Sequence, residues 1–319
     1  MAHSTGSPAV GIDLGGTNIK TALISREGRI LARDLRPTGA QDGAEAVVRH
    51  MVEGVEATAA QGGVALKDLA GVGVGVPAVI SRQGVAVLAP NLHWRDFPVR
   101  AALQDHLPAP VRVDNDASVA ALAEARVGSG AGCASLFFIT IGTGIGGGIV
   151  FDGRLYHGAS FDPGEIGHVC ILPDGPLCGC GQKGCLEALS SGTAMVRDAR
   201  AALAGGRRSK ALDLAEGRAE RVTPEVICHA AQEGDGMARD IVRSAAEYLG
   251  IAVSNVIHLL SPEVIAIGGG ISEAGPILLD PLIETARRRT LPGMFAHTRV
   301  VQAQLRNDAG AIGAGLLVF

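Results

Sequence analysis

The sequence predicts an α/β protein that contains two similar halves. Its 319 residues correspond to roughly two domains at about 150 residues each. Short apolar runs typical of strands alternate with longer segments of helical spacing, which is the pattern of an α/β fold. A strand–turn–strand–hairpin pattern also occurs twice. With 47% hydrophobic and 19% charged residues, the chain is neither disordered nor fibrous.

The first half begins with two strands joined by a glycine turn. Residues 9–13 form an apolar run that ends at Gly15-Gly16-Thr17, and residues 19–25 resume as a strand. Glu27-Gly28 then predicts a hairpin to a strand at 29–33. The other elements expected in this half are a helix at 44–59, a strand at 72–76 that Pro77 ends, a helix at 98–107, a strand at 111–113 and a helix at 118–127.

The second half repeats the opening of the first. The segments GIDLGGTNIKTALISREGRI and FITIGTGIGGGIVFDGRL share a strand, a glycine–threonine turn, a strand and a glycine hairpin. We therefore infer an internal duplication, with strands at 136–141 and 149–151 in the second copy. The remaining elements expected here are an irregular segment at 155–187, helices between 193 and 260, a strand at 264–267 and a final helix at 309–318.

Charge and composition exclude several classes of partner. The net charge is −4 and only 3% of the residues are aromatic. The chain therefore has neither the excess of basic residues nor the stacking side chains that are typical of nucleic-acid-binding proteins. The N-terminal MAHSTGSPAV has neither the basic nor the apolar region of a signal peptide. The uncharged stretch 127–151 contains eight glycines, which argues against a membrane helix. We expect a cytoplasmic protein that binds neither nucleic acid nor membrane.

Six cysteines lie at positions 133, 170, 178, 180, 185 and 228. A disulfide framework is not expected in a long chain without a secretory signal. Three of the six fall within eight residues, from Cys178 to Cys185, and such clustering predicts a metal site.

Three strands end in glycine-rich turns, at 15–17, 142–148 and 268–270. Glycine turns let backbone N–H groups approach phosphate, although any one of them could be only a tight connection. Together they favour a nucleotide site between two duplicated domains. The Walker and protein-kinase motifs are absent. The spacing of Gly142, Gly144 and Gly147 imitates a dinucleotide fingerprint, but a strand follows it where that fold requires a helix.

Four motifs in order resemble those of the ROK family of sugar kinases, and within it the zinc-containing glucokinases of bacteria. They are Asp13-Leu14-Gly15-Gly16-Thr17, Asn115-Asp116-Ala117, Gly164-Glu165-Ile166-Gly167-His168 and the run from Cys178 to Glu187. The resemblance implies two duplicated actin-like (ribonuclease H-like) ATPase domains with a cleft between them. It also implies ATP with Mg²⁺, a structural Zn²⁺, and a homodimer or homotetramer. The expected domains are 8–114 plus 307–319, which is smaller, and 115–306, which carries the zinc loop.

For the nucleotide, the resemblance implies residues from all three glycine turns. Asp13 would lie near Mg²⁺ and the phosphates, and Lys20 would neutralise developing phosphate charge. A turn-forming Asp13 and a solvated Lys20 are the plainer interpretation. The residues implied in holding the phosphates and the adenosine are Gly15, Gly16, Thr17, Thr143, Gly144, Gly268, Gly269 and Gly270.

For the sugar, the resemblance implies that Asp116 is the general base and that Asn115 binds a sugar hydroxyl. Both residues are also good helix N-caps, which is the alternative interpretation. Ser118 stands where the family usually has a second asparagine. Glu165, His168 and Glu187 are implied as further sugar ligands.

For the metal, the resemblance implies a closed zinc site made of His168, Cys178, Cys180 and Cys185, a standard structural donor set. Free thiols on a loop are the alternative.

The expected activity is ATP-dependent phosphorylation of glucose to glucose 6-phosphate. N-acylmannosamine, mannose, fructose or allose could replace glucose, and polyphosphate could replace ATP. A sugar-responsive repressor of the family that lacks its DNA-binding domain is a further alternative. Such repressors carry an N-terminal helix-turn-helix domain, for which a first strand near residue 9 leaves no room, and a noncatalytic module would be expected to lose Asp116.

Overall fold

A computed structural model describes residues 6–161 and 163–319. Part of the N-terminal segment judged not to be a signal peptide, residues 1–5, lies outside the described residues. The chain forms two compact units. The first contains the chain up to Phe138 together with Gly148–Gly164 and Asn307–Phe319, and the second contains Ile139–Gly147 and Glu165–Arg306. The domain boundaries that the family resemblance implies stay a prediction.

The first unit is built on a five-stranded sheet of order β3-β2-β1-β4-β8. Strands β1, β2 and β3 are antiparallel neighbours, whereas β1, β4 and β8 run parallel. The apolar residues of β1 and β4 are completely buried, as expected for strands covered on both faces. The five strands are β1 (Ala9–Leu14), β2 (Asn18–Ile24), β3 (Ile30–Pro37), β4 (Gly71–Val76) and β8 (Val111–Asn115).

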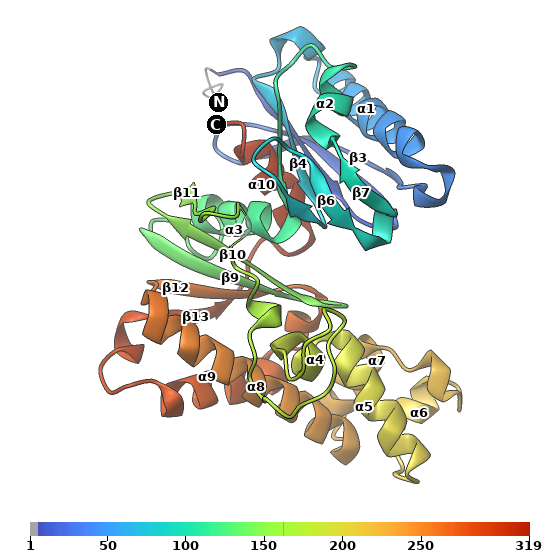
Figure 1. Ribbon diagram of the computed structural model, residues 1–319, viewed down its shortest axis with the longest axis vertical. Coiled ribbons are helices and arrows are strands. Elements are labelled where there is room, and N and C mark those ends of the chain that lie inside the picture. The colour runs from blue at the N-terminus through green and yellow to red at the C-terminus, as the bar shows by residue number, and fades with distance from the viewer. Residues whose placement is uncertain (1–5, 162) are drawn as a thin grey trace. The chain divides into compact units, whose positions relative to one another are not determined.

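Helices cover both faces of this sheet (Figure 1). One face packs against α1 (Ala44–Gln61), whose buried residues follow the predicted helical spacing. The other face packs against α10 (Ala309–Leu316), which also contacts α3 (Asp116–Val127). The unit also contains α2 (Val99–Gln104) and a small sheet that was not expected, made of β5 (Val79–Ile80), β6 (Ala86–Ala89) and β7 (Trp94–Phe97).

A second sheet repeats the strand order of the first, as β11-β10-β9-β12-β13. In each sheet the first three strands of the copy lie in reverse chain order and are followed by two later strands. The predicted duplication is therefore confirmed at the level of topology. The strands are β9 (Ser135–Ile141), β10 (Ile145–Phe151), β11 (Arg154–Leu155), β12 (Val264–Gly268) and β13 (Arg299–Gln302).

Strand β10 begins four residues earlier than the sequence indicated. Its glycines suggested a long turn, but they lie within the strand. One of these glycines, Gly148, is required by packing. A Cβ at this position would lie 2.6 Å from Cβ of Ala121 and 2.9 Å from the carbonyl oxygen of Ala117. The glycine allows close packing of β10 on α3, and does not form a turn.

The second unit, which holds β12, β13 and the adjoining ends of β9 and β10, is otherwise mostly helical. Its longest helix, α8, packs along α9 and also contacts α4, α5 and α7 (Figure 1). Helix α9 was not expected, because Pro281 inside it obscures the helical pattern. The helices are α4 (Leu186–Ser190), α5 (Gly192–Ala204), α6 (Lys210–Leu214), α7 (Pro224–Gln232), α8 (Gly236–Leu260) and α9 (Pro276–Arg289).

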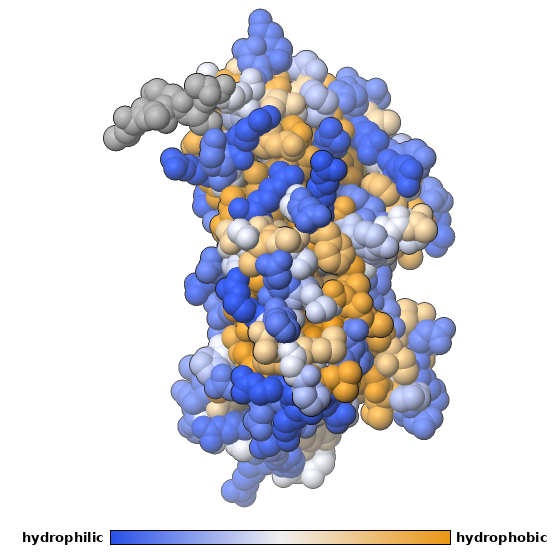
Figure 2. Space-filling model, turned by 90° about the vertical axis from the view of Figure 1, so that its left-hand side faces the viewer, coloured by the Kyte–Doolittle hydropathy of each residue, from blue (hydrophilic) through white to orange (hydrophobic). Residues whose placement is uncertain are grey.

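Hydrophilic residues are interspersed with smaller hydrophobic patches over the face that Figure 2 shows. Across residues 6–161 and 163–319, no helix combines the length and the apolar composition that crossing a bilayer requires.

Candidate active site

In the first unit, the candidate residues gather at one edge of the sheet. The parallel register places Asp13 beside Gly75, and Gly75 beside Asp114. Only β4 lies between β1 and β8. Because neighbouring strands lie about 4.8 Å apart, the ends of β1 and β8 are close together. The sheet thus brings the first glycine turn and the Asn115-Asp116 pair to the same edge.

Asp13 and Lys20 form an ion pair at the base of the first glycine turn. They face each other across the β1–β2 ladder, with 3.3 Å between Lys20 Nζ and Asp13 Oδ2. Lys20 Nζ also lies 3.3 Å from the carbonyl oxygen of Asn307. Both side chains are partly exposed, by 21% for Asp13 and 43% for Lys20. A carboxylate and an ammonium therefore remain accessible beside a turn of exposed backbone.

Asn115 is the N-cap of α3. Its Oδ1 accepts hydrogen bonds from the N–H groups of Ala117 and Ser118 at 2.9 and 3.1 Å, and its Nδ2 donates to the carbonyl of Ala78 at 3.2 Å. The capping interpretation is thus correct for Asn115. Asp116 follows at the first helical position, where its Oδ1 accepts from the N–H of Ala117 at 2.9 Å.

The residue before this pair makes a contact that the sequence did not reveal. Asp114 is buried, and its Oδ2 lies 2.7 Å from Nε2 of His157. The His157 ring stacks on Phe161 at 4.1 Å between centroids. No local motif marks this pair, because 43 residues separate Asp114 from His157.

In the second unit, the turn between β9 and β10 is held by the start of α5. The carbonyl of Gly142 accepts from the N–H of Gly192 at 2.8 Å, and the carbonyl of Thr143 accepts from the hydroxyl of Thr193 at 2.8 Å. These bonds fix a turn that carries Thr143 and Gly144.

A cavity of about 590 Å³ opens beside this turn. Its lining includes Thr143 from the turn, Gly192 and Thr193 from the start of α5, and Thr223 and Pro224 from the start of α7. A smaller cavity of about 170 Å³ shares Pro224 and lies against Gly270, at the end of the third glycine turn. Both turns have a glycine motif in the sequence, whereas the α5 and α7 residues that complete these cavities have none.

The predicted metal ligands come together in the second unit. The donor atoms of His168, Cys178, Cys180 and Cys185 all lie within 4.8 Å of one another. Cys178 Sγ is 3.7 Å from His168 Nδ1, and Cys180 Sγ is 3.6 Å from Cys185 Sγ. Zinc bonds of about 2.3 Å to sulfur and 2.0–2.1 Å to nitrogen separate tetrahedral donors by about 3.5–3.8 Å. The donor types and these two separations are those of a Zn²⁺ site.

The thiols of this cluster differ in acidity. Burial raises the pKa of the Cys178 thiol, and raises the pKa of Cys185 to about 12. A hydrogen bond from the N–H of Gln182 lowers the pKa of Cys180. A bound cation would reverse the effect of burial, because it stabilises thiolates directly.

Glu187 lies between the metal cluster and the β9–β10 turn. Its Oε2 accepts the N–H of Ile145 at 3.0 Å, and its Oε1 is 3.7 Å from Cys178 Sγ. A Cβ on Gly144 would lie only 2.4 Å from Oε2 of Glu187, so the carboxylate packs directly under the glycine. This contact was not foreseen for Glu187.

Glu165 lies near the opposite side of the His168 ring. Its Oε2 is 3.8 Å from Nε2 of His168, while Nδ1 is the ring atom near Cys178. A carboxylate on one side of the ring and metal-binding thiols on the other is the arrangement found around many metal-bound histidines. At 3.8 Å, however, the contact between Glu165 and His168 is longer than a hydrogen bond. The expected sugar ligands therefore form two sets, with Asn115 and Asp116 in the first unit and Glu165, His168 and Glu187 in the second.

The sequence profile described as the ROK family matches residues 9–319. A glucokinase of Halalkalibacterium halodurans is 38% identical over 311 residues, which cover 97% of this chain and 94% of that protein.

Two solved structures have the same fold. A ROK family glucokinase from Streptomyces griseus, in complex with glucose and AMPPNP, matches with a TM-score of 0.84 and 34% identity, covering 98% of this chain and 99% of that one. A ROK family transcriptional regulator, homologous to the MLC protein of E. coli, matches with a TM-score of 0.87 and 28% identity, covering 100% of this chain and 79% of that one. The predicted actin-like fold is confirmed.

Proposed function

The chain belongs to the ROK family, and on this premise we propose that it is a glucokinase that transfers the γ-phosphoryl group of ATP to the 6-hydroxyl of glucose. The observation that carries the proposal is the placement of Asp116 on the sheet edge that also holds the Asp13–Thr17 turn. The 38% identity to a glucokinase and the likeness to a glucokinase bound to glucose and AMPPNP support it.

Phosphoryl transfer requires mainly positioning and charge neutralisation from the protein. We assign the phosphates to the turns at Gly15–Thr17 and Thr143–Gly144, and the adenosine side to Gly268–Gly270. Lys20 would supply a positive charge near the transferred group. When bound, Mg²⁺ would neutralise phosphate oxygens, and Asp13 is the carboxylate at hand beside the first turn.

We assign Asp116 as the general base, which accepts the proton of the sugar 6-hydroxyl as the new O–P bond forms. Its Oδ1 is oriented by the N–H of Ala117 at the first turn of α3. This hydrogen bond orients the carboxylate before substrate binds. A well-placed base of this kind contributes about 10²–10⁴ in rate.

The sugar would be held by Asn115, Glu165, His168 and Glu187. In Asn115 the oxygen is engaged by α3 and one N–H is donated to Ala78. Because an amide nitrogen carries two hydrogens, the second N–H is the group that we assign to a sugar hydroxyl. Carboxylates at Glu165 and Glu187 would accept hydrogen bonds from neighbouring hydroxyls.

We further propose a structural zinc at His168, Cys178, Cys180 and Cys185. The spacing of the donor atoms supports this assignment. With four protein ligands the site is closed and has no position for a substrate. Its role would be to hold Glu165, His168 and Glu187 in one arrangement, so zinc would act on sugar binding through these side chains.

A sugar-responsive regulator is the second candidate, because a transcriptional regulator has the same fold. The presence of Asp116 favours the kinase, since binding a sugar alone requires no base. Among kinases, another hexose could replace glucose.

A coupled assay of ADP release with Mg-ATP tests the proposal across glucose, mannose, fructose, allose and N-acetylmannosamine. We expect the highest kcat/KM with glucose. Binding of glucose without ADP release from any sugar would favour the regulator, and a higher kcat/KM for another hexose would change the assigned substrate.

A further inference from the structure

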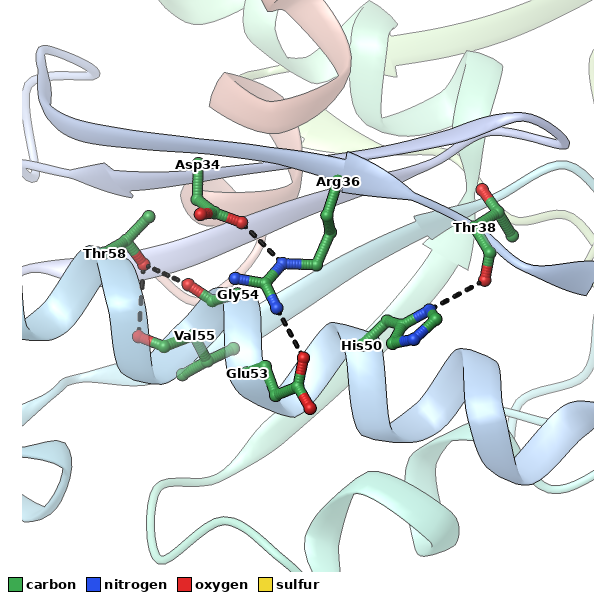
Figure 3. A network of polar contacts seen from close by, with 8 residues as sticks. All are labelled: Asp34, Arg36, Thr38, His50, Glu53, Gly54, Val55 and Thr58. Carbon is green, nitrogen blue, oxygen red and sulfur yellow. Dashed lines mark hydrogen bonds and ion pairs between the residues drawn. The ribbon is translucent and has the colours of Figure 1, made fainter.

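Thr38 makes three hydrogen bonds around the first glycine turn. It lies just after β3 and is completely buried. Its N–H donates to the carbonyl of Thr17 at 2.8 Å, and its hydroxyl donates to the carbonyl of Gly15 at 2.6 Å. Its own carbonyl lies 3.1 Å from Nδ1 of His50 on α1 (Figure 3). One residue thus connects two carbonyls of the turn to a helix.

The two carbonyl bonds determine which way the turn presents its N–H groups. A peptide group is planar and trans, so its C=O and N–H point in opposite directions. The carbonyls of Gly15 and Thr17 point toward Thr38. The N–H groups of the same two peptides, which belong to Gly16 and Asn18, must therefore point away from Thr38. Successive backbone N–H groups of a turn that face the same side form a binding site for phosphate.

Helix α1 holds Thr38 in place. Because a carbonyl only accepts, His50 must carry its proton on Nδ1 to make this bond. Arg36 reinforces the same junction, with its Nε 2.7 Å from Asp34 and its Nη1 2.7 Å from Glu53 on α1 (Figure 3). The position of Thr38 relative to the turn is therefore set by β3 and α1 together.

We propose that Thr38 is a positioning residue for ATP: its hydroxyl and N–H draw the Gly15 and Thr17 carbonyls away from the phosphates and so present the opposite N–H groups to them. The inference rests on the proposed kinase function, in which this turn holds the phosphoryl groups. Thr38 itself does not touch the nucleotide in this proposal, and it acts through the backbone of the turn.

Thr38→Val tests this role, because valine keeps the volume and the backbone N–H but removes the hydroxyl bond to Gly15. We expect the KM for ATP to rise about tenfold, the effect expected for one buried hydrogen bond and its unpaired acceptor. The KM for glucose should stay within about twofold of wild type. Thr38→Ser keeps the hydroxyl and should restore the KM for ATP.

Thr58→Val is the matched control. Thr58 is also completely buried in the first unit, but its hydroxyl donates to the carbonyls of Gly54 and Val55 within α1 (Figure 3). This variant loses a buried threonine hydroxyl without touching the turn. It should leave the KM for ATP unchanged, whatever its effect on the melting temperature.

Calorimetric titration with AMPPNP at saturating glucose gives a second readout, and weaker binding by Thr38→Val alone supports the proposal. If Thr38→Val does not fold, Thr38→Cys, which has only a weak donor, replaces it and should bind AMPPNP less tightly than wild type. A Thr38 variant that folds and keeps the wild-type KM and affinity for the nucleotide would overturn the role of Thr38. The kinase function would still stand in that case, provided that the wild-type protein is active. An inactive wild type would instead reject the proposed function.

Discussion

The carboxylate of Glu187 accepts a hydrogen bond from the backbone N–H of Ile145 at 3.0 Å, and its other oxygen lies 3.7 Å from Cys178 Sγ. One side chain therefore contacts both the turn that carries Thr143 and the cluster of metal ligands. If Glu187 also binds sugar, as we propose, then nucleotide, sugar and metal sites share a residue. Changes at Glu187 should consequently affect more than one ligand.

Substitutions of Glu187 can separate these roles. Glu187→Gln retains an oxygen that can accept the N–H of Ile145, so the KM for ATP should change little while the KM for glucose rises. Glu187→Ala loses the acceptor and should raise both KM values. Glu165→Gln is the control, since Glu165 pairs with His168, and it should raise only the KM for glucose. Equal KM values for ATP in the two Glu187 variants would contradict the contact with the turn.

Asp116→Asn tests the general base. The amide keeps the size of the side chain and can still accept the N–H of Ala117, but it cannot take a proton. We expect kcat to fall by at least about 10², with the affinity for glucose, measured by calorimetry, largely retained. Asp235→Asn alters a carboxylate at the start of another helix, α8, and should leave kcat unchanged. Normal turnover by Asp116→Asn would show that Asp116 is not the general base and serves only at the start of α3.

Much of the fold could be predicted because its information is local. Strands such as Ala9–Leu14, the helix at Ala44–Gln61 and the repeated glycine turns each have a pattern within a few residues. Helix α9 was missed because Pro281 interrupts its pattern, and β13 because all four of its residues are half-buried or exposed.

The site was less predictable where contacts join distant positions. The metal ligands lie close in sequence, and their clustering could be foreseen. The contact of Glu187 with Ile145 spans 42 residues, and the pair of Asp114 and His157 spans 43. Thr38 was also missed, because its hydrogen bonds to Gly15 and Thr17 depend on the register of β2 and β3.

The proposed zinc should be measurable by elemental analysis, with about one zinc per chain. Cys180→Ser removes one ligand from a closed site and should lose both the metal and most of the affinity for glucose. Cys170→Ser is the control, because Cys170 is an exposed cysteine outside the cluster, and it should keep both. A metal-free wild type with full activity would reject a zinc at this cluster.

Asp235 should stabilise the protein in a pH-dependent way. Burial alone would raise its pKa, but hydrogen bonds from the N–H groups of Ala238 and Lys210 and from the Ser209 hydroxyl outweigh it, so the pKa lies below the ordinary value of 3.8. A carboxylate with a depressed folded pKa stabilises above its unfolded pKa, and this contribution is lost as the pH falls through the folded value.

Asp235→Ala should therefore lower the free energy of unfolding by about 1 kcal/mol at pH 7, the typical effect of an N-cap. The difference from wild type should shrink as the pH falls below about 4. Urea unfolding of both proteins at several pH values measures it. A difference that stays constant down to pH 3 would show that the charge of Asp235 contributes nothing.

Identification of the product tests the glucokinase proposal most directly. The wild-type protein is incubated with Mg-ATP and glucose, and the products are analysed by ³¹P and ¹³C NMR. We predict a new phosphate ester whose phosphorus couples to carbon 6 of glucose, formed in step with ADP. ATP that stays intact, or ADP that accumulates with inorganic phosphate and no sugar ester, would contradict the proposal.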